Sequence, residues 1–510
     1  MKNQNKNIYR ALLILTFIGL NLLIVSAISQ VITYLNTGAD KSKMLNLSLK
    51  SESVYKPHLL WSDTLNPSRP LEKPTQKRVA QDYLNAWYVR EVAFNSGEQK
   101  GLEDYYTESA RKKIDSLITV NNSANTRIEA TTLSHDLKLE FYSADGQLIS
   151  FTDNNVEEAK RVFKGEELLL EEQSSSTYRV VMLLEDGFWR IRQFVKIPSL
   201  KKDSIVQKGI VTKFKDLHQG VNYYPKSSAW DTFGEAFNQD TLSTDFKKIR
   251  SLGFNTIRVF VGYKDFGEAD VKAEKLVKLK ILMDVAHKQK LQVIVTLFDF
   301  YGDYSVIDWS NTFMHSRQIV NALKGHPALA CYDVKNEPNL DFDSRGEKLV
   351  RFWLKSHLAH IKQLDPKTAV TIGWSNLQSA QLLLESVDIV SFHSYQSFES
   401  FKTEFKELKS KTSKPLVLQE FGLSTYSGIW NPLGASEQKQ ADYYSDFLGF
   451  AAQNELNYTL WTLYDFNEIP TAVVGRLPWR KAQQKHFGLY KDNGEAKKAV
   501  EVVKQYTNAR

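Results

Sequence analysis

Residues 254–298 read FNTIRVFVGYKDFGEADVKAEKLVKLKILMDVAHKQKLQVIVTLF. An apolar run at 254–261 is followed by a helical pattern from Val271 to Gln289 and by a second apolar run, Leu291–Phe298. Short apolar runs are typical of strands buried on both faces, and parallel strands need a helical connection between them. The segment therefore predicts a strand–helix–strand unit in a parallel sheet.

The same alternation continues on both sides of this unit and fills residues 208–510. Helical patterns recur at Gly346–Leu364 and Glu437–Asn454. Eight such units predict a (β/α)₈ barrel, an architecture of roughly 250 residues or more. The expected strands lie near Val221–Tyr224, Phe254–Val261, Leu291–Phe298, Leu329–Val334, Ala369–Trp374, Ile389–Phe392, Leu416–Leu418 and Tyr458–Leu463.

Two acidic residues stand at the carboxyl ends of predicted strands, where barrels of this kind collect their chemistry. Glu337 follows the fourth strand in Asn336-Glu337-Pro338, and Glu420 ends the seventh in Gln419-Glu420-Phe421-Gly422. A facing pair of carboxyl groups is what glycoside hydrolysis requires: one protonates the leaving oxygen, and the other attacks or activates water. Arg258 on the second strand could bind a carboxylate through two parallel N–H donors and keep it ionised.

These motifs resemble the cellulase-type glycoside hydrolases of clan A, most closely in the style of glycoside hydrolase family 5. The resemblance runs through most of residues 208–510. It implies that Glu337 is the general acid/base and Glu420 the nucleophile, and that no metal or organic cofactor is needed. The matching segments are Gly220–Tyr224, Gly253–Arg258, Asn336–Pro338, His393 with Tyr395, Glu420–Gly422, Trp461 and Phe487–Tyr490.

The resemblance also implies roles for the neighbouring residues. Asn336 would bond the sugar 2-hydroxyl, Arg258 and Tyr395 would hold Glu420, His393 would line the site near Glu337, and Trp461 would form the floor beneath the sugar. One departure concerns the segment after the third strand, where many members of the family carry a histidine. Here Leu297–Gly302 reads LFDFYG, which places Asp299 or an aromatic residue there and leaves the substrate subsite open.

Residues 74–200 predict a separate α+β domain. A helical stripe covers Gln76–Phe94, a second helix is expected at Leu102–Ile118, and strands follow. Asp145-Gly146 and Asp186-Gly187 each supply the positive φ angles of a tight hairpin. The order of elements resembles the cystatin-like cone fold of nuclear transport factor 2-like domains. No catalytic group of residues stands out, so we expect a packing or docking role, with a protein partner as one option.

The amino-terminal end carries a membrane signal. Residues 11–34 are largely apolar, no charged residue occurs from Ala11 to Ala39, and Lys2, Lys6 and Arg10 precede the segment. About 20 apolar residues cross a bilayer, and basic flanks stay in the cytoplasm. We expect a cytoplasmic end (1–10), a single transmembrane anchor (11–34) and a linker (35–73), with the rest outside the cytoplasm. The alternative is a cleaved signal peptide, because Val25-Ser26-Ala27 offers small residues to a peptidase.

Composition narrows the remaining options. The chain has 510 residues, a net charge of +7, and one cysteine, Cys331, which excludes a disulfide framework. No dense basic stripe indicates nucleic acid. The sequence thus predicts a membrane-anchored, retaining β-glycosidase acting on a β-linked polysaccharide of glucan or mannan type. A transglycosylase coupled to polysaccharide synthesis or export, and a non-catalytic glycan-binding or assembly protein, remain alternatives.

Overall fold

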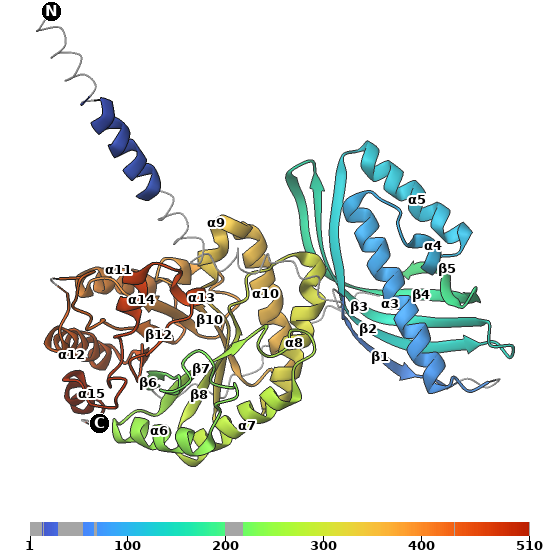
Figure 1. The fold of residues 1–510 in the computed structure, drawn as a ribbon. Coiled ribbons are helices and arrows are strands. Elements are labelled where there is room, and N and C mark those ends of the chain that lie inside the picture. The colour runs from blue at the N-terminus through green and yellow to red at the C-terminus, as the bar shows by residue number, and fades with distance from the viewer. Residues whose placement is uncertain are drawn as a thin grey trace, which may run out of the picture.

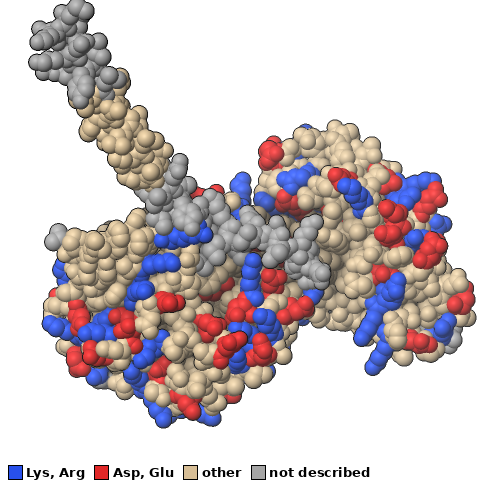
Figure 2. Space-filling view, in the orientation of Figure 1, with Lys and Arg blue, Asp and Glu red and all other residues tan. Residues whose placement is uncertain are grey.

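The computed structural model describes residues 13, 15–28, 55–65, 69–198, 218–432 and 434–508. Beyond the short amino-terminal helix, these residues form two bodies (Figure 1). One is a smaller domain of a curved sheet with helices on one face, and the other is a closed barrel surrounded by helices. On the face drawn in Figure 2, basic and acidic side chains are interspersed over both bodies.

The larger body is an eight-stranded parallel barrel, closed in the order β6 to β13. The strands match the eight expected runs closely, because each is an apolar segment buried on both sides. They are β6 (Gln219–Asn222), β7 (Thr256–Gly262), β8 (Gln292–Asp299), β9 (Leu329–Asn336), β10 (Ala369–Trp374), β11 (Val390–Ser394), β12 (Leu416–Phe421) and β13 (Asn457–Leu460).

Helices cover the outside of the barrel and bury their apolar faces against the strands (Figure 1). Polar residues start several of them: the side chain of Asn238 accepts hydrogen bonds from the backbone N–H groups of Asp240 and Thr241 at the first turn of α6. The long helices are α6 (Gln239–Ser251), α7 (Ala273–Lys288), α8 (Trp309–Leu323), α10 (Glu347–Leu364), α11 (Phe398–Lys411), α12 (Glu437–Asn454) and α15 (Ala499–Asn508).

Short helices lie in the loops that follow the strands. They are η1 (Val306–Asp308), η2 (Pro338–Asp341), α9 (Phe342–Arg345), η3 (Ser379–Gln381), α13 (Thr471–Val474) and α14 (Pro478–Gln484). Of these, α13 and α14 fill the long connection between β13 and α15, and η2 begins directly after Glu337. These loops stand at the carboxyl ends of the strands and build the mouth of the barrel.

The smaller body contains a five-stranded sheet in the order β1 to β5, with helices against one face (Figure 1). The hairpin at Asp186-Gly187 forms as expected, with φ of 53° at Asp186 and 82° at Gly187. At Asp145-Gly146 only Gly146 has a positive φ, of 74°, and residues 143–147 form a longer loop than the tight hairpin that was expected. The elements are β1 (His58–Asp63), α3 (Lys73–Ser96), α4 (Leu102–Tyr105), α5 (Glu108–Ser123), β2 (Thr126–Tyr142), β3 (Leu148–Lys164), β4 (Glu167–Glu185) and β5 (Phe188–Ile197).

Two details of this domain differ from expectation. Strand β1 lies inside the segment 35–73 that was read as a linker, and it pairs in parallel with β2. The single helix expected at Leu102–Ile118 is two helices, because Tyr106 adopts extended backbone and Thr107 donates its N–H to Ile191 at 3.1 Å. The likeness to nuclear transport factor 2 stays a prediction.

A buried polar network ties α3 to the sheet. The hydroxyl of Tyr83 donates to Asp153 at 2.7 Å, and the ring of His135 bonds Asp153 at 2.6 Å through Nδ1 and Thr132 at 2.7 Å through Nε2. The four side chains are buried. The arrangement is that of a hydroxyl–imidazole–carboxylate relay, but a substrate has no access to it, so it serves to hold the domain together.

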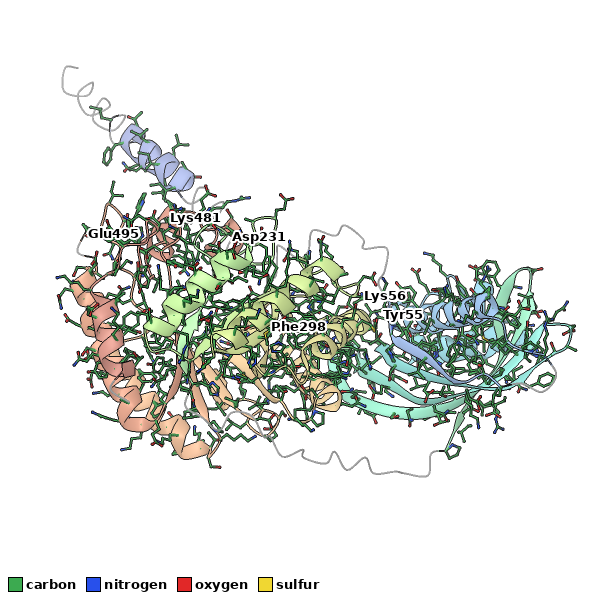
Figure 3. The ribbon with its side chains drawn as sticks, turned by 90° about the horizontal axis from the view of Figure 1, so that it is seen from below. Tyr55, Lys56, Asp231, Phe298, Lys481 and Glu495 are labelled. Atoms are coloured by element: carbon green, nitrogen blue, oxygen red, sulfur yellow. The ribbon has the colours of Figure 1, made fainter. Side chains whose placement is uncertain are left out.

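The two bodies meet where β2 packs against η1 and α8. The backbone N–H of Lys56 donates to the Ser310 hydroxyl at 2.9 Å, and Figure 3 shows Lys56 at the junction. Leu133 of β2 and Ala159 of β3 are buried as part of the same apolar core as the barrel. The small domain is thus fixed to the barrel beside the loop that follows β8.

The predicted anchor at 11–34 is covered only in part. Residues 15–28 are helical and their apolar side chains are largely exposed, whereas the rest of the span, apart from Leu13, lies outside the described residues, as do residues 1–10. Within the described residues, we find no helix with the length and apolar character needed to cross a membrane.

Candidate active site

The mouth of the barrel holds a pocket of about 430 Å³. Two of its lining residues are Glu337, placed directly after β9, and Glu420, on β12. Aromatic side chains form much of the wall, and a polar patch comes from α14. The residues that line the pocket are Tyr224, Trp230, Phe260, Asp299, Phe300, Asn336, Glu337, Tyr395, Glu420, Gly422, Leu423, Ser424, Trp461, Val473, Val474, Arg480, Gln483, Gln484 and Phe487.

The backbone at each carboxylate is specialised. Glu337 has a φ of 49°, in the left-handed region, and its N–H donates to the Gly373 carbonyl at 2.6 Å. Non-glycine residues in this region are strained, and such strain clusters at functional sites. After Glu420, a Cβ on Gly422 would lie 2.4 Å from the Trp461 carbonyl oxygen, so only glycine fits there.

Arg258 organises the site from below. Its guanidinium is fully buried and lies 2.5 Å from Oε1 of Glu420 and 2.7 Å from Oδ2 of Asp333. It also donates to the side-chain oxygens of Asn336 at 2.9 Å, Thr296 at 3.0 Å and Asn222 at 3.1 Å. Every direction in which this planar group can donate is occupied, so the Glu420 carboxylate is held in one orientation.

Tyr395 reaches the second oxygen of Glu420. Its hydroxyl donates to Oε2 at 3.1 Å, while 47% of the residue stays exposed at the pocket. Withdrawal of the hydroxyl from water, together with the nearby charges of Glu420 and Glu337, raises the pKa of Tyr395 well above its usual value. The tyrosine therefore remains a hydrogen-bond donor at neutral pH.

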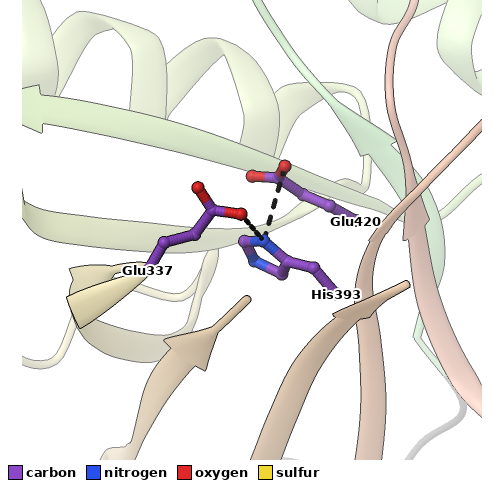
Figure 4. Close-up of side chains that lie close together, drawn as sticks. All are labelled: Glu337, His393 and Glu420. Atoms are coloured by element: carbon purple, nitrogen blue, oxygen red, sulfur yellow. Dashed lines mark hydrogen bonds and ion pairs between the residues drawn. The ribbon is translucent and has the colours of Figure 1, made fainter. Parts of the chain in front are cut away.

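His393 lies between the two carboxylates, as Figure 4 shows. Its Nδ1 is 2.9 Å from Oε1 of Glu337 and 3.5 Å from Oε2 of Glu420. The imidazole is fully buried and is not among the pocket-lining residues, so it supports the carboxylates from behind. One ligand atom each from Glu337, His393 and Glu420 lies within 4.8 Å of the other two, and this is the one such cluster among the described residues that could hold a metal ion.

Trp461 forms part of an aromatic wall. It is 5% exposed and packs edge-on to Tyr224 and Phe260, whose rings are parallel and 5.2 Å apart. Burial and the charges of Asp299 and Glu420 raise the pKa of Tyr224 well above its usual value. Flat apolar faces of this kind suit the C–H faces of sugar rings.

The structure brings all seven residues predicted for the site to the mouth of the barrel. Glu337, Glu420, Asn336, Tyr395 and Trp461 line the pocket, and Arg258 and His393 lie directly beneath it. Asp299 and Phe300 also line the pocket, at the end of β8 where the sequence placed Asp299 or an aromatic residue.

Sequence reasoning missed Asp333 and the α14 residues. Asp333 is fully buried, and its Oδ2 accepts from Arg258 and from the Thr296 hydroxyl at 2.8 Å. The position of Asp333 inside an apolar strand could have indicated its role, because a buried carboxylate is almost always paired with a cation or a hydrogen-bond donor. The α14 residues Arg480, Gln483 and Gln484 sit in a long irregular connection that carries no periodic pattern.

Comparisons with known proteins agree with this geometry. Residues 218–467 match the family model for cellulase, glycosyl hydrolase family 5. Human β-glucuronidase is 25% identical over 305 residues, which cover 52% of this chain and 42% of that protein, and the rat protein of the same name is 23% identical over 280 residues, covering 50% of this chain and 40% of that protein. The chain thus spans about two-fifths of the length of the curated relatives it matches.

Similar solved structures include the exo-β-1,4-mannosidase Op5Man5 from Opitutaceae bacterium strain TAV5, at 20% identity and a TM-score of 0.49, covering 59% of this chain and 62% of that chain. Another is GH5_18 from Streptomyces cattleya in complex with GlcNAc, at 17% identity and a TM-score of 0.47, covering 57% and 80% respectively. Residues 218–467, which include all eight strands of the barrel, are thus similar to the cellulase model of glycosyl hydrolase family 5.

Proposed function

We propose that the protein is a retaining β-glycosidase that cleaves a β-linked glycan by double displacement. The observation that carries this proposal is the spacing of the two carboxyl groups, whose nearest ligand oxygens lie within 4.8 Å of one another. Retaining enzymes set these groups about 5–5.5 Å apart, whereas inverting enzymes leave about 6.5–9.5 Å for a water molecule. This short gap between oxygens favours direct attack by Glu420 over attack by a water molecule held between the two carboxyl groups.

In the first step, a carboxylate oxygen of Glu420 forms a bond to the anomeric carbon of the sugar. The bond from that carbon to the glycosidic oxygen breaks, and Glu337 gives its proton to the departing oxygen. Arg258 and Tyr395 hold the two oxygens of Glu420, so the nucleophile is aimed before the substrate arrives.

In the second step, Glu337 takes a proton from a water molecule, whose oxygen attacks the same carbon and releases Glu420. His393 bonds Glu337 at 2.9 Å and fixes the position of this acid/base through both steps. Asn336 has its amide oxygen occupied by Arg258, which turns the NH₂ group into the donor available to a sugar hydroxyl.

The glycan itself is part of the proposal. Glucan and mannan types follow from the resemblance to cellulases, and the name of the curated relatives adds β-glucuronides as a further candidate. We also propose that the enzyme works outside the cytoplasm, held at a membrane by the segment 11–34. What supports this is the uncharged sequence from Ala11 to Ala39 behind a basic end.

The test is a screen of the purified protein against aryl β-glycosides and β-glycans, with Glu337→Gln and Glu420→Gln beside it. Loss of a general acid/base is expected to lower kcat about 10²- to 10⁴-fold, and loss of the nucleophile at least as much. The matched control is Glu385→Gln, an exposed glutamate shortly before β11 at the other end of the barrel strands, which should retain full activity. Hydrolysis that persists unchanged in both active-site variants would overturn the proposal.

A further inference from the structure

The helix α14 presents one polar face to the catalytic pocket. Arg480, Gln483 and Gln484 all line the pocket, and they occupy positions i, i+3 and i+4 of this helix. Side chains at that spacing lie on the same face. The helix is set in place by Pro478 at its first position, by the Gln483 carbonyl, which accepts from the Ser424 hydroxyl at 2.6 Å, and by Lys481, whose amine donates to Thr471 at 3.0 Å.

Arg480 is the one basic residue that lines the pocket. Its side chain makes no ion pair and no hydrogen bond within the described part of the chain, and the residue is exposed. Arg258, the other arginine of the site, is fully buried and has each of its donors engaged. The free guanidinium of Arg480 is therefore the group that can bind an anion in this pocket.

The other charged residues that line the pocket are acidic and repel an anion. Asp299, Glu337 and Glu420 line it elsewhere, and like charges that approach within a few ångströms repel each other strongly. A negatively charged group on a substrate would be repelled by this cluster and attracted by Arg480. A neutral sugar gains nothing from this division of charge, whereas an acidic sugar is oriented by it.

We propose that the pocket accepts a glycan carrying a uronic acid, and that Arg480 binds the carboxylate of that sugar, with the amides of Gln483 and Gln484 as further donors. The guanidinium fork matches a planar carboxylate through two parallel N–H bonds. This inference rests on the proposed glycosidase function and names its substrate class. Arg480 is a specificity residue: it touches the substrate but takes no part in the displacement.

The experiment compares substrates that differ only at C6. One pair is 4-nitrophenyl β-D-glucuronide and 4-nitrophenyl β-D-glucoside, and the other is β-1,4-linked glucuronic acid oligomers and cello-oligosaccharides of equal length. We expect the wild type to prefer the acidic member of at least one pair. In Arg480→Gln, kcat/KM for that acidic substrate should fall about 10- to 100-fold, since a hydrogen bond to a charged group contributes about that factor. The value for the neutral partner should stay within about twofold.

Two further variants sharpen the result. Arg480→Lys keeps the charge but loses the fork, so it should recover part of the preference. Lys485→Gln removes the same charge from the residue directly after α14, which does not line the pocket, and should leave the preference intact. Thermal unfolding of each variant checks that the fold is kept.

The contrary outcomes are distinct from each other. A wild type that cleaves only neutral members, or an Arg480→Gln variant that lowers both members of a pair equally, overturns this inference and leaves the glycosidase proposal standing. A wild type that cleaves no member of either pair, nor any β-glycan of the wider screen, overturns both.

Discussion

Nη1 of Arg258 lies 2.5 Å from Oε1 of Glu420, although the two residues are 162 positions apart in the chain. The arginine stands on β7 and the glutamate on β12, so the contact crosses the barrel. Asp333 takes the other side of the guanidinium at 2.7 Å. The Glu420 carboxylate is thus held by the buried guanidinium of Arg258, and Asp333 in turn fixes the position of that guanidinium.

Replacement of Arg258 by lysine tests whether the planar guanidinium, with its several N–H donors, is needed. Arg258→Lys keeps one positive charge but cannot serve Glu420, Asp333 and Asn336 together, so the Glu420 carboxylate loses its fixed orientation. We expect kcat to fall about 10²- to 10³-fold, the range for loss of a preorganised donor. Steady-state kinetics on the best substrate of the screen measures it, with circular dichroism to confirm folding. A kcat within threefold of wild type would contradict the assignment.

Removal of the Tyr395 hydroxyl tests the second contact to Glu420. Tyr395→Phe deletes the donor that lies 3.1 Å from Oε2 of Glu420 and leaves the ring in the pocket wall. We expect kcat to decrease about 10- to 100-fold with a smaller change in KM, since a hydrogen bond to a charged group is lost. Tyr506→Phe, which alters a hydroxyl on α15 far along the chain, is the control and should behave as wild type. An unchanged kcat in Tyr395→Phe would assign the tyrosine to packing alone.

Asp308 predicts a pH-dependent stability. Burial, with the nearby carboxylates of Asp303 and Glu268, raises the pKa of this carboxyl to about 7. In the unfolded chain it ionises near pH 4. From about pH 4 to pH 7 the folded state therefore binds more protons than the unfolded state, and the free energy of unfolding falls as pH rises through that window.

Asp308→Asn should remove this pH-dependent fall in the free energy of unfolding, because asparagine does not titrate. The Tm of the variant minus that of wild type should grow as pH rises from about 4 to 7 and then level off, which scanning calorimetry at a series of pH values would measure. Gln378→Asn, at an exposed position directly before η3, changes no titratable group, so its Tm difference should not change with pH. A Tm difference in Asp308→Asn that likewise does not change with pH would refute the raised pKa.

The buried network of the small domain predicts a loss of stability that spares catalysis. Tyr83→Phe removes the hydroxyl that donates to Asp153 and leaves a buried carboxylate with one donor fewer. We expect the free energy of unfolding of this domain to fall by about 1–3 kcal/mol, measured by urea denaturation. Tyr88→Phe is the matched control, because its hydroxyl makes no hydrogen bond within the described residues. Equal stability of the two variants would show that the network contributes little.

The barrel could be predicted from the sequence because each of its strands is marked by the residues of that strand alone. Each strand is an apolar run with its own boundaries, and Glu337 and Glu420 could be placed at one end of the sheet by the parallel topology alone. The hairpin at Asp186-Gly187 is equally local, since the backbone angles of those two residues set the turn.

The features that could not be predicted from the sequence depend on contacts between residues far apart in the chain. Strand β1 pairs with β2, as in His58 with Ser134, 76 positions later, and no residue near His58 indicates that partner. Asp333 was passed over because its importance lies in Arg258, on another strand. Arg480 reaches the pocket only through the path of a long connection after β13.

The central claim concerns the pair Glu337 and Glu420, and the stereochemistry of the product tests it most directly. Proton NMR of the reducing sugar, recorded in the first minutes of hydrolysis of the best β-linked substrate, shows which anomer is released before mutarotation. Double displacement predicts that the β-anomer appears first and the α-anomer only later. Release of the α-anomer first would mean a single displacement by water and would contradict the account.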